Sequence, residues 1–263
     1  MHSQRSEAGH QLADDATTDA VLGGRLQLRQ PRRGHRVGHD AILLAAATPV
    51  LAGEHAVELG AGVGAAGLAL AQRCPGLRVT LVDNDDALVA LATENARANG
   101  FAGRVHAVAL DVGAVPERFA AAGLPPGSAD RVLMNPPFND PDRQQASPDT
   151  RRRAAHVAVP GLLSGWLGTA GRLLRDGGTL TAIHRADGLA DMLAGLAGPF
   201  GATAVTPVHP KPGAPAIRVL VRAVKGSRAA LSLRPPLILA ESDGRPTRAA
   251  EEILRDAKPL DEN

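Results

Sequence analysis

The sequence predicts an α/β fold in which a mostly parallel sheet lies between layers of helices, and three observations support this prediction. First, the largely apolar residues 54–59 are typical of a buried strand, and they run into a glycine-rich turn. Second, an Ala- and Leu-rich pattern over residues 65–73 predicts a helix directly after that turn. Third, residues 78–82, of which Val79, Leu81 and Val82 are apolar, predict a second strand that ends in Asp83. Strand, glycine turn, helix and strand-ending acid form the opening of a nucleotide-binding α/β unit.

The length of 263 residues and the apolar content of 44% predict one large domain with short additions. We expect a disordered tail over residues 1–24, a strand and helix on the substrate side over 25–50, the core over 51–226, and a C-terminal strand and helix over 227–263. The polar start does not have the pattern of a secretory signal. No run of 18 apolar residues is present, so no membrane span is predicted.

The cysteine and histidine content points to metal-free chemistry in the cytoplasm. Cys74 is the single cysteine, so it has no partner for an internal disulfide or a cysteine zinc site. The nine histidines show no ligand spacing with a carboxylate or a cysteine.

The segment before the core predicts one short strand and one helix. Residues 25–28 alternate polar and apolar, and Pro31 and Gly34 are expected to end that strand. An apolar helical run follows over residues 41–47, with Asp40 at the position of an N-cap. Capping is the structural interpretation of Asp40, and a functional role requires it to face a bound ligand.

The glycine turn is Glu58-Leu-Gly60-Ala-Gly62-Val-Gly64. Glycines allow a tight turn and a close approach to a ligand at the positive end of the following helix. Asp83 comes about 20 residues later, where an acid can accept hydrogen bonds from ribose hydroxyls. The two signals together predict a nucleotide-like cofactor more strongly than either alone.

The third and fourth strands also end in polar residues. A helix over 85–98 and a strand over 104–110 lead to Asp111, which is either a turn residue or a ligand-binding acid. The apolar residues 132–134 form the fourth strand and are followed by Asn135, Pro136, Pro137 and Phe138.

The Asn135-Pro136-Pro137-Phe138 stretch combines a rigid turn with two recognition groups. The prolines end the strand because each lacks an N–H and fixes its own backbone. Asn135 then offers a carbonyl acceptor and an NH₂ donor, and Phe138 offers a flat apolar face. An ordinary strand-ending turn is the structural alternative.

The second half of the chain completes an alternating pattern. We expect a loop over 140–150, a helix through residues 162–174 with Trp166 in the core, a fifth strand over 179–183 and a helix over 189–197. Two last core strands, 205–208 and 217–223, are predicted to form an antiparallel pair, with a rigid proline-rich connection over 201–215. The extension adds a strand at 237–239 and a helix at 247–255.

The net charge of +2 is too small to argue for nucleic-acid binding, but the arginines gather locally. One cluster precedes the core, and the other follows the Asn135 turn. A solvated surface is the structural alternative for both clusters. Their members are Arg25, Arg29, Arg32, Arg33 and Arg36 in the first cluster, and Arg151, Arg152 and Arg153 in the second.

The glycine turn resembles the first motif of class I S-adenosylmethionine-dependent methyltransferases. The resemblance implies a Rossmann-like, seven-stranded methyltransferase sheet and S-adenosylmethionine as cofactor. It places the strand-two acid on the cofactor ribose and the acid after strand three on the adenine amine. The cofactor-binding residues implied or expected are Asp40, Glu58, Gly60, Gly62, Gly64, Asp83, Asn84, Asp111, Val112 and Asn135.

An Asn-Pro-Pro-aromatic sequence after strand four implies that the methyl acceptor is a planar, conjugated nitrogen. The Asn135 oxygen and the Pro136 carbonyl can accept both N–H hydrogens of an NH₂ group. These acceptors favour the transition state, in which the nitrogen becomes tetrahedral and positive. Phe138 would stack on the target base. The catalytic residues implied are Asn135, Pro136 and Phe138.

The chain as a whole resembles the bacterial tRNA1(Val) adenine-N6 methyltransferases. The resemblance rests on residues 18–19, 22–26, 30–31 and 34–46, the two motifs above, and Pro235-Pro-Leu-Ile-Leu239 followed by a helix. It implies tRNA as substrate, Asp40 near the cofactor, and Arg36, Arg151, Arg152 and Arg153 as candidate RNA contacts. One departure is Phe138, where Tyr is frequent in the family.

Three other interpretations remain open on the sequence. The same Asn-Pro-Pro turn occurs in enzymes that methylate a glutamine of protein release factors, although these usually carry a helical N-terminal domain. Related small methyltransferases act on ribosomal RNA. The third is a cofactor-binding fold retained as an RNA-binding scaffold, which the intact Asn135 turn and Asp83 disfavour. The sequence does not indicate an oligomeric state.

Overall fold

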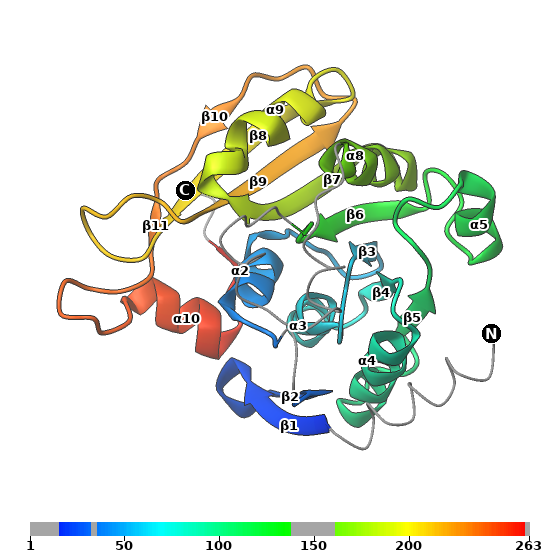
Figure 1. Ribbon diagram of the computed structural model, residues 1–263, viewed down its shortest axis with the longest axis horizontal. Helices are drawn as coiled ribbons and strands as arrows, with labels where there is room; N and C mark the ends of the chain where they lie inside the picture. The colour runs from blue at the N-terminus through cyan, green and yellow to red at the C-terminus, as the bar shows by residue number, and fades with distance from the viewer. Residues whose placement is uncertain (1–15, 33–35, 138–160, 261–263) are drawn as a thin grey trace, which may run out of the picture.

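The computed structural model describes residues 16–32, 36–137 and 161–260. Figure 1 shows a twisted central sheet between two layers of helices, as the sequence predicted. The sheet has nine strands in the order β10-β8-β9-β7-β6-β3-β4-β5, and β11 also pairs with β8. Its strands are β3 (His55–Leu59), β4 (Arg78–Asp83), β5 (Val105–Ala109), β6 (Ala129–Met134), β7 (Leu174–Arg185), β8 (Phe200–His209), β9 (Arg218–Lys225), β10 (Ser232–Leu233) and β11 (Leu237–Ile238).

The topology places one edge of the sheet in position to bind a ligand. Strands β5, β4, β3, β6 and β7 are parallel, so their carboxyl ends meet at the same edge. The chain order reverses between β3 and β6, which are paired in the middle of the sheet. Ligands of open α/β sheets bind at such a reversal, outside the carboxyl ends of the strands.

Helices cover both faces because each strand alternates its apolar side chains between two cores. Ala56 of β3 belongs to one core, and its neighbours Val57 and Leu59 belong to the other. The first core packs under α2 (His39–Ala47), α3 (Ala65–Arg73) and α4 (Asp86–Ala98). The second packs under α5 (Pro116–Ala121), α8 (Leu162–Leu173) and α9 (Leu189–Leu196).

The predicted disordered tail extends too far into the chain. Residues 16–24 form β1 (Ala16–Val21) and the short 3-10 helix η1 (Leu22–Gly24), which lead into β2 (Leu26–Pro31). Pro31 ends the strand β2, as the sequence predicted. It is the last residue of β2 and pairs with Ala16, and a strand end tolerates the missing N–H of proline.

Asn95 of α4 and Asn99, the C-cap of that helix, hold the hairpin β1–β2 against the core. Asn95, which is fully buried, accepts the Arg29 N–H (2.7 Å) and donates to the Arg29 carbonyl (3.0 Å). Asn99, one helical turn later, does the same for Gln27, with distances of 2.9 and 2.7 Å. The two amides thus satisfy backbone groups along β2, as a neighbouring strand would.

The C-terminal extension packs against the first core. Helix α10 (Arg248–Asp256) has Thr247 as its N-cap, whose hydroxyl accepts the Ala250 N–H. Arg25, next to η1, donates to the Arg255 carbonyl and pairs with Asp256, so η1 and the end of α10 lie side by side. The expected connection over residues 201–215 is wrong in its first part, because β8 already begins at Phe200.

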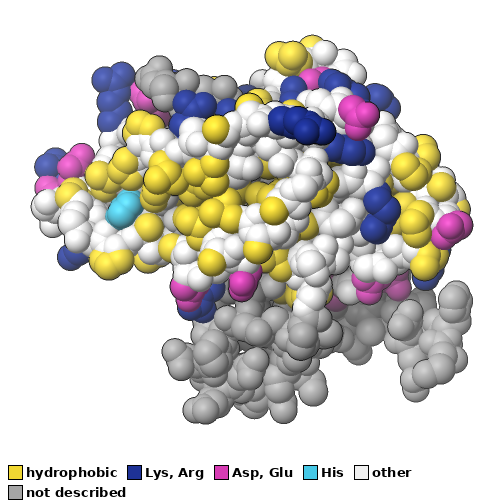
Figure 2. Space-filling view, turned by 90° about the horizontal axis from the view of Figure 1, so that it is seen from above, with side chains coloured by type: hydrophobic (Ala, Val, Ile, Leu, Met, Phe, Trp, Pro, Cys, Tyr) yellow, Lys and Arg dark blue, Asp and Glu magenta, His cyan; other side chains and the backbone are white. Residues whose placement is uncertain are grey.

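The top of Figure 1 is the face shown in Figure 2, where hydrophobic side chains form a band and Lys and Arg side chains gather along one margin. None of the helices in the described part of the chain combines the length and the apolar character needed to cross a bilayer.

Candidate active site

The structure brings three predicted residues into one row at the carboxyl edge of the sheet. Leu59, the last residue of β3, pairs with Val82 of β4 on one side and with Met134 of β6 on the other. The residues that come next in the chain are Gly60 after β3, Asp83 at the end of β4 and Asn135 after β6. Neighbouring strands are about 4.8 Å apart, so the glycine turn lies between the acid and the amide at the point where the strand order reverses.

The glycine turn contains two glycines required by packing and one that faces open space. All three have positive φ, with values of 67° at Gly60, 56° at Gly62 and 87° at Gly64. A Cβ added to Gly60 would lie 2.4 Å from the Trp166 ring, and one added to Gly64 would lie 2.6 Å from Leu81. A Cβ on Gly62 would meet nothing within 4 Å among the described atoms. Gly62 is thus the glycine whose backbone a ligand can reach.

Asp83 holds the turn in place. Its Oδ2 accepts the Gly62 N–H at 2.7 Å, and its Oδ1 accepts the Asp85 N–H at 3.0 Å. Burial raises the pKa of the Asp83 carboxyl, and these backbone N–H groups oppose that rise. Each carboxylate oxygen has a second lone pair, so both can accept a further hydrogen bond. Asn84, the next residue, is exposed.

Glu58, on β3, is buried beneath the turn, and its side chain contacts the helix that follows the turn. Its Oε2 accepts the Gly67 N–H in the first turn of α3 at 2.7 Å. Burial raises the pKa of Glu58 to about 8, and the nearby charge of Asp83 acts in the same direction. The side chain is therefore mostly protonated at neutral pH. A direct contact between Glu58 and a cofactor stays a prediction.

Asp111 and Val112 lie after β5, at the same edge. The Leu110 N–H donates to the Asp83 carbonyl at 2.8 Å and ties the ends of β4 and β5 together. Asp111 is exposed, and its Oδ1 accepts the Gly113 N–H at 2.7 Å, so one oxygen has the role of a turn residue. Val112 is buried, and its carbonyl accepts the Thr169 hydroxyl.

Asn135 and Pro136 directly follow β6, with Asn135 half-buried and Pro136 buried. Phe138, Arg151, Arg152 and Arg153 lie outside the described residues, so their predicted roles stay predictions. The sequence interpretation missed one neighbour. Met134 pairs with Ala182, so Asn135 and Pro136 lie beside the last residues of β7, which include the buried His184. Burial lowers the pKa of His184 and favours its neutral form.

Asp40 is not an N-cap, and that prediction is wrong. Helix α2 begins at His39 with Gly38 as its N-cap, and Asp40 lies in the first turn. Its Oδ2 instead accepts from Arg218 Nε at 2.9 Å. Because Arg218 pairs with Arg185 at the end of β7, this ion pair lies at the carboxyl edge of the sheet. That position is compatible with the predicted place of Asp40 near a cofactor.

Arg36, the candidate RNA contact within the described chain, interacts with the hairpin. Its guanidinium donates to Thr17 and forms an ion pair with Asp19, and both residues belong to β1. The Gln30 amide donates to the same Asp19 carboxylate at 2.7 Å and accepts the Val37 N–H at 2.9 Å. This network joins Arg36 and Val37 to the hairpin, and an RNA contact by Arg36 stays a prediction.

Within the described ranges, no three His, Cys, Asp or Glu side chains gather closely enough to hold a metal ion.

The sequence matches the family described as "Methyltransferase small domain" over residues 35–205. A tRNA1(Val) (adenine(37)-N6)-methyltransferase of Bacteroides fragilis is 30% identical over 193 residues, which cover 71% of this chain and 76% of that protein. A protein of the same name from Erwinia tasmaniensis is 33% identical over 115 residues, 43% of this chain. The match spans only 44% of the Erwinia protein's own length.

Among solved structures, a predicted O-methyltransferase from Agrobacterium tumefaciens superposes with a TM-score of 0.71 at 30% identity. The match covers 84% of this chain and 98% of that protein. The Rossmann-like methyltransferase fold predicted from the sequence is therefore confirmed. Together with the match over residues 35–205, these similarities show that the chain belongs to the methyltransferase small-domain family and confirm, at the level of that family, the prediction of an S-adenosylmethionine-dependent methyltransferase.

Proposed function

We propose that this protein transfers a methyl group from S-adenosylmethionine to the exocyclic N6 of an adenine in RNA, in tRNA1(Val) beside the anticodon. The observation that carries the proposal is the row formed by Gly60, Asp83 and Asn135, which sets a cofactor-type turn directly beside an amide acceptor. The choice of tRNA1(Val) as substrate comes from the relatives, several of which are named tRNA1(Val) (adenine(37)-N6)-methyltransferase.

The residues at the edge of the sheet fit S-adenosylmethionine. Open space beside Gly62 admits the ligand next to the N-terminus of α3. In this proposal the Asp83 carboxylate would accept hydrogen bonds from the ribose hydroxyls, and the second oxygen of Asp111 would accept one from the adenine amine. Asn84 and Val112 flank these two acids, and Asp40 would close the site from α2. The bound cofactor supplies a methyl group on a positively charged sulfur.

Asn135 and Pro136 would activate the acceptor nitrogen. The N6 lone pair of adenine is delocalised into the ring and is a poor nucleophile. Hydrogen bonds from its two N–H groups to Asn135 Oδ1 and to the Pro136 carbonyl strengthen as the nitrogen becomes tetrahedral and positive. The nitrogen lone pair forms the bond to the methyl carbon, and the carbon–sulfur bond breaks. One N–H proton then leaves to water, so no strong base is required.

Phe138 follows Pro137 in the sequence, and we propose that it stacks on the flipped adenine. Its ring lacks the hydroxyl that Tyr has at this place in the family. Stacking requires only the flat aromatic face, so the change from Tyr to Phe is compatible with this role.

The N-terminal segment favours RNA over a protein acceptor. The glutamine methyltransferases considered above usually carry a helical domain before the glycine turn. Here the hairpin β1–β2 and the helix α2 precede the turn, and Asn95 and Asn99 fix the hairpin to the core. A ribosomal RNA small subunit methyltransferase C from Pseudomonas aeruginosa, 34% identical over 133 residues, keeps ribosomal RNA as the second candidate acceptor.

Transfer of labelled methyl groups tests the proposal. The purified protein is incubated with labelled S-adenosylmethionine and, separately, with total tRNA, ribosomal RNA and a release factor, all from a strain lacking this protein. We expect label in tRNA, and nuclease digestion should recover it as N6-methyladenosine. Label in ribosomal RNA would replace the tRNA assignment, and label in the release factor would refute RNA as the substrate class.

A further inference from the structure

Three strands beside the candidate acceptor site continue past the end of β6. Met134, the last residue of β6, pairs with Ala182 of β7, and β7 continues to Arg185. Arg185 pairs with Arg218, the first residue of β9, and Arg218 pairs with Val208 near the end of β8. At about 3.3 Å per residue, β7, β9 and β8 therefore extend about 10 Å beyond the end of β6.

The β8–β9 loop, residues 210–217, stands on this extended part of the sheet and lies beside β11 (Figure 1). Strand β9 is antiparallel to both β7 and β8, so β8 ends and β9 begins at the edge where β6 and β7 have their carboxyl ends. The glycine turn, Asp83 and Asp111 follow β3, β4 and β5, on the other side of β6. The β8–β9 loop thus lies on the acceptor side of the candidate site, roughly 10–15 Å from β6 across the sheet.

Hydrogen bonds and prolines give the β8–β9 loop a defined conformation. His209 Nδ1 lies 2.6 Å from the Ala214 carbonyl oxygen, and this nitrogen donates because a carbonyl only accepts. The Ala214 N–H donates to the Lys211 carbonyl at 3.2 Å, and the Ile217 N–H donates to the Val208 carbonyl at 2.9 Å. Three prolines fix further backbone angles of the loop, namely Pro210, Pro212 and Pro215.

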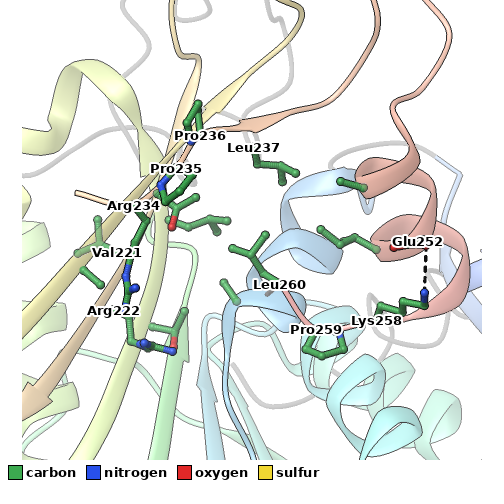
Figure 3. A pocket seen from close by; sticks show the side chains of 17 residues that line it. Val221, Arg222, Arg234, Pro235, Pro236, Leu237, Glu252, Lys258, Pro259 and Leu260 are labelled. Carbon is green, nitrogen blue, oxygen red and sulfur yellow. Dashed lines mark ion pairs between the residues drawn. The ribbon is translucent and has the colours of Figure 1, made fainter. Parts of the chain in front are cut away.

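The C-terminal extension supports the loop from one side. The Ala240 N–H donates to the Pro210 carbonyl at 3.1 Å, and the Leu239 N–H donates to the His209 carbonyl at 2.9 Å. The extension is itself anchored, because Leu237 of β11 is 4% exposed and lines a cavity between the sheet and the helices α2 and α10 (Figure 3). A loop that is already ordered loses little conformational entropy when it binds a partner.

The exposed side chains of the β8–β9 loop combine one positive charge with apolar surface. Lys211 is exposed and forms no ion pair with any residue that the structure describes, including Glu241 on the neighbouring turn. Ile217 is 45% exposed, and Pro212 and Pro215 are also exposed. No Asp or Glu occurs between residues 206 and 217. This combination matches a nucleotide, which offers a negative phosphate beside the less polar faces of its ribose and base.

We propose that the β8–β9 loop binds the RNA substrate next to the methyl-transfer site. Lys211 contacts a backbone phosphate, and Pro215 and Ile217 pack against the ribose and base of a nucleotide that flanks the target adenine. At its distance from β6, the loop reaches flanking nucleotides and not the adenine itself. The proposal rests on the proposed function in taking RNA as the partner, and it adds a surface that orients the RNA strand.

Binding of a fluorescein-labelled tRNA1(Val) transcript to the full chain, measured by fluorescence anisotropy at several salt concentrations, tests the proposal. Lys211→Gln should weaken binding about fivefold, and it should lower the salt dependence of binding by about one phosphate contact. Ile217→Ser should weaken binding about fivefold and leave the salt dependence unchanged. Both variants should raise the KM for tRNA and leave kcat within about twofold, because the loop does not touch the reacting atoms.

Two control variants carry the same kinds of change away from the carboxyl edge of the sheet. Arg78→Gln removes one positive charge at the first residue of β4, which is exposed and lies at the opposite edge. Leu51→Ser removes an apolar side chain that is 65% exposed in the segment before β3. Both controls should bind the transcript as the unaltered protein does.

The proposal is overturned if the unaltered protein does not bind the transcript, or if either Lys211→Gln or Ile217→Ser binds it as tightly as its control. An unchanged salt dependence in Lys211→Gln would also overturn it. Should the two variants bind tRNA normally while the unaltered protein methylates tRNA, the loop proposal alone fails. Should they bind tRNA weakly while the unaltered protein methylates only the release factor, the proposed function alone fails. Normal tRNA binding with impaired methylation of the release factor would assign the loop to a protein partner and overturn the proposal.

Discussion

Replacing Glu58 by Gln should change how the stability of the protein depends on pH. Burial beneath the glycine turn raises the pKa of Glu58 from 4.5 to about 8 in the folded state. At pH values between 4.5 and about 8, Glu58 keeps its proton in the folded protein and releases it in the unfolded chain. Stability supplied by the neutral carboxyl is therefore fully present below about pH 4.5 and decreases as the pH rises toward about 8. Gln has the shape of the protonated acid, does not titrate, and can accept the Gly67 N–H.

The magnitude follows from the same two values. Each pH unit over which the folded state holds one extra proton costs about 1.4 kcal/mol, so the loss reaches at most about 5 kcal/mol above pH 8. The Glu58→Gln variant should match the unaltered protein near pH 5 and exceed it in free energy of unfolding near pH 9. The raised pKa of Asp83 adds a pH dependence of stability with the same sign, and the variant retains it.

Urea unfolding at several pH values between about 5 and 9 measures this difference. Glu251→Gln, at an exposed position in the first turn of α10, provides the same chemical change without burial. The reasoning is refuted if the two variants show the same pH dependence, or if Glu58→Gln loses stability relative to the unaltered protein as the pH rises.

Three further substitutions test the packing and the cofactor contacts. Gly60→Ala should destabilise the protein by about 1–3 kcal/mol more than Gly62→Ala in urea unfolding, because only the first adds a clash to the positive φ; equal costs would contradict the close approach of the indole ring. Asn95→Leu should cost about 3 kcal/mol, because buried backbone groups of β2 lose their partners, and a cost no larger than that of the half-buried Asn99→Leu would contradict this role. Asp83→Ala should weaken S-adenosylmethionine binding about tenfold by calorimetry, and unchanged affinity would remove the ribose contact.

The sequence predicted the core elements well because their signals are local. The buried strand β3, the glycine turn and helix α3 are consecutive, and each has its own pattern of apolar residues or glycines. The row of Gly60, Asp83 and Asn135 followed from one topological rule, that parallel strands end at the same edge. These features required no knowledge of contacts between distant parts of the chain.

The missed features depend on distant partners. Strand β1 contains Thr17, Thr18 and Asp19 and therefore has no apolar alternation, and its pairing with β2 and the docking of β2 on Asn95 and Asn99 stabilise it. Asp40 occupies a plausible capping position, but its structural partner is Arg218, 178 residues later.

His184 was missed for a related reason. Its place beside Pro136, next to Asn135, appears only when β6 and β7 are aligned. The one local signal was its position at the end of the fifth strand, the same kind of position that identified Asp83 and Asn135.

The central claim is that Asn135 activates the acceptor nitrogen and contributes only weakly to holding the cofactor. Methyl transfer by Asn135→Ala under saturating S-adenosylmethionine and tRNA tests it most directly. We predict that the rate falls by about 100-fold or more, as expected for loss of one transition-state hydrogen bond, while the cofactor Kd changes by no more than a few-fold. A near-normal rate in this variant would contradict the mechanism.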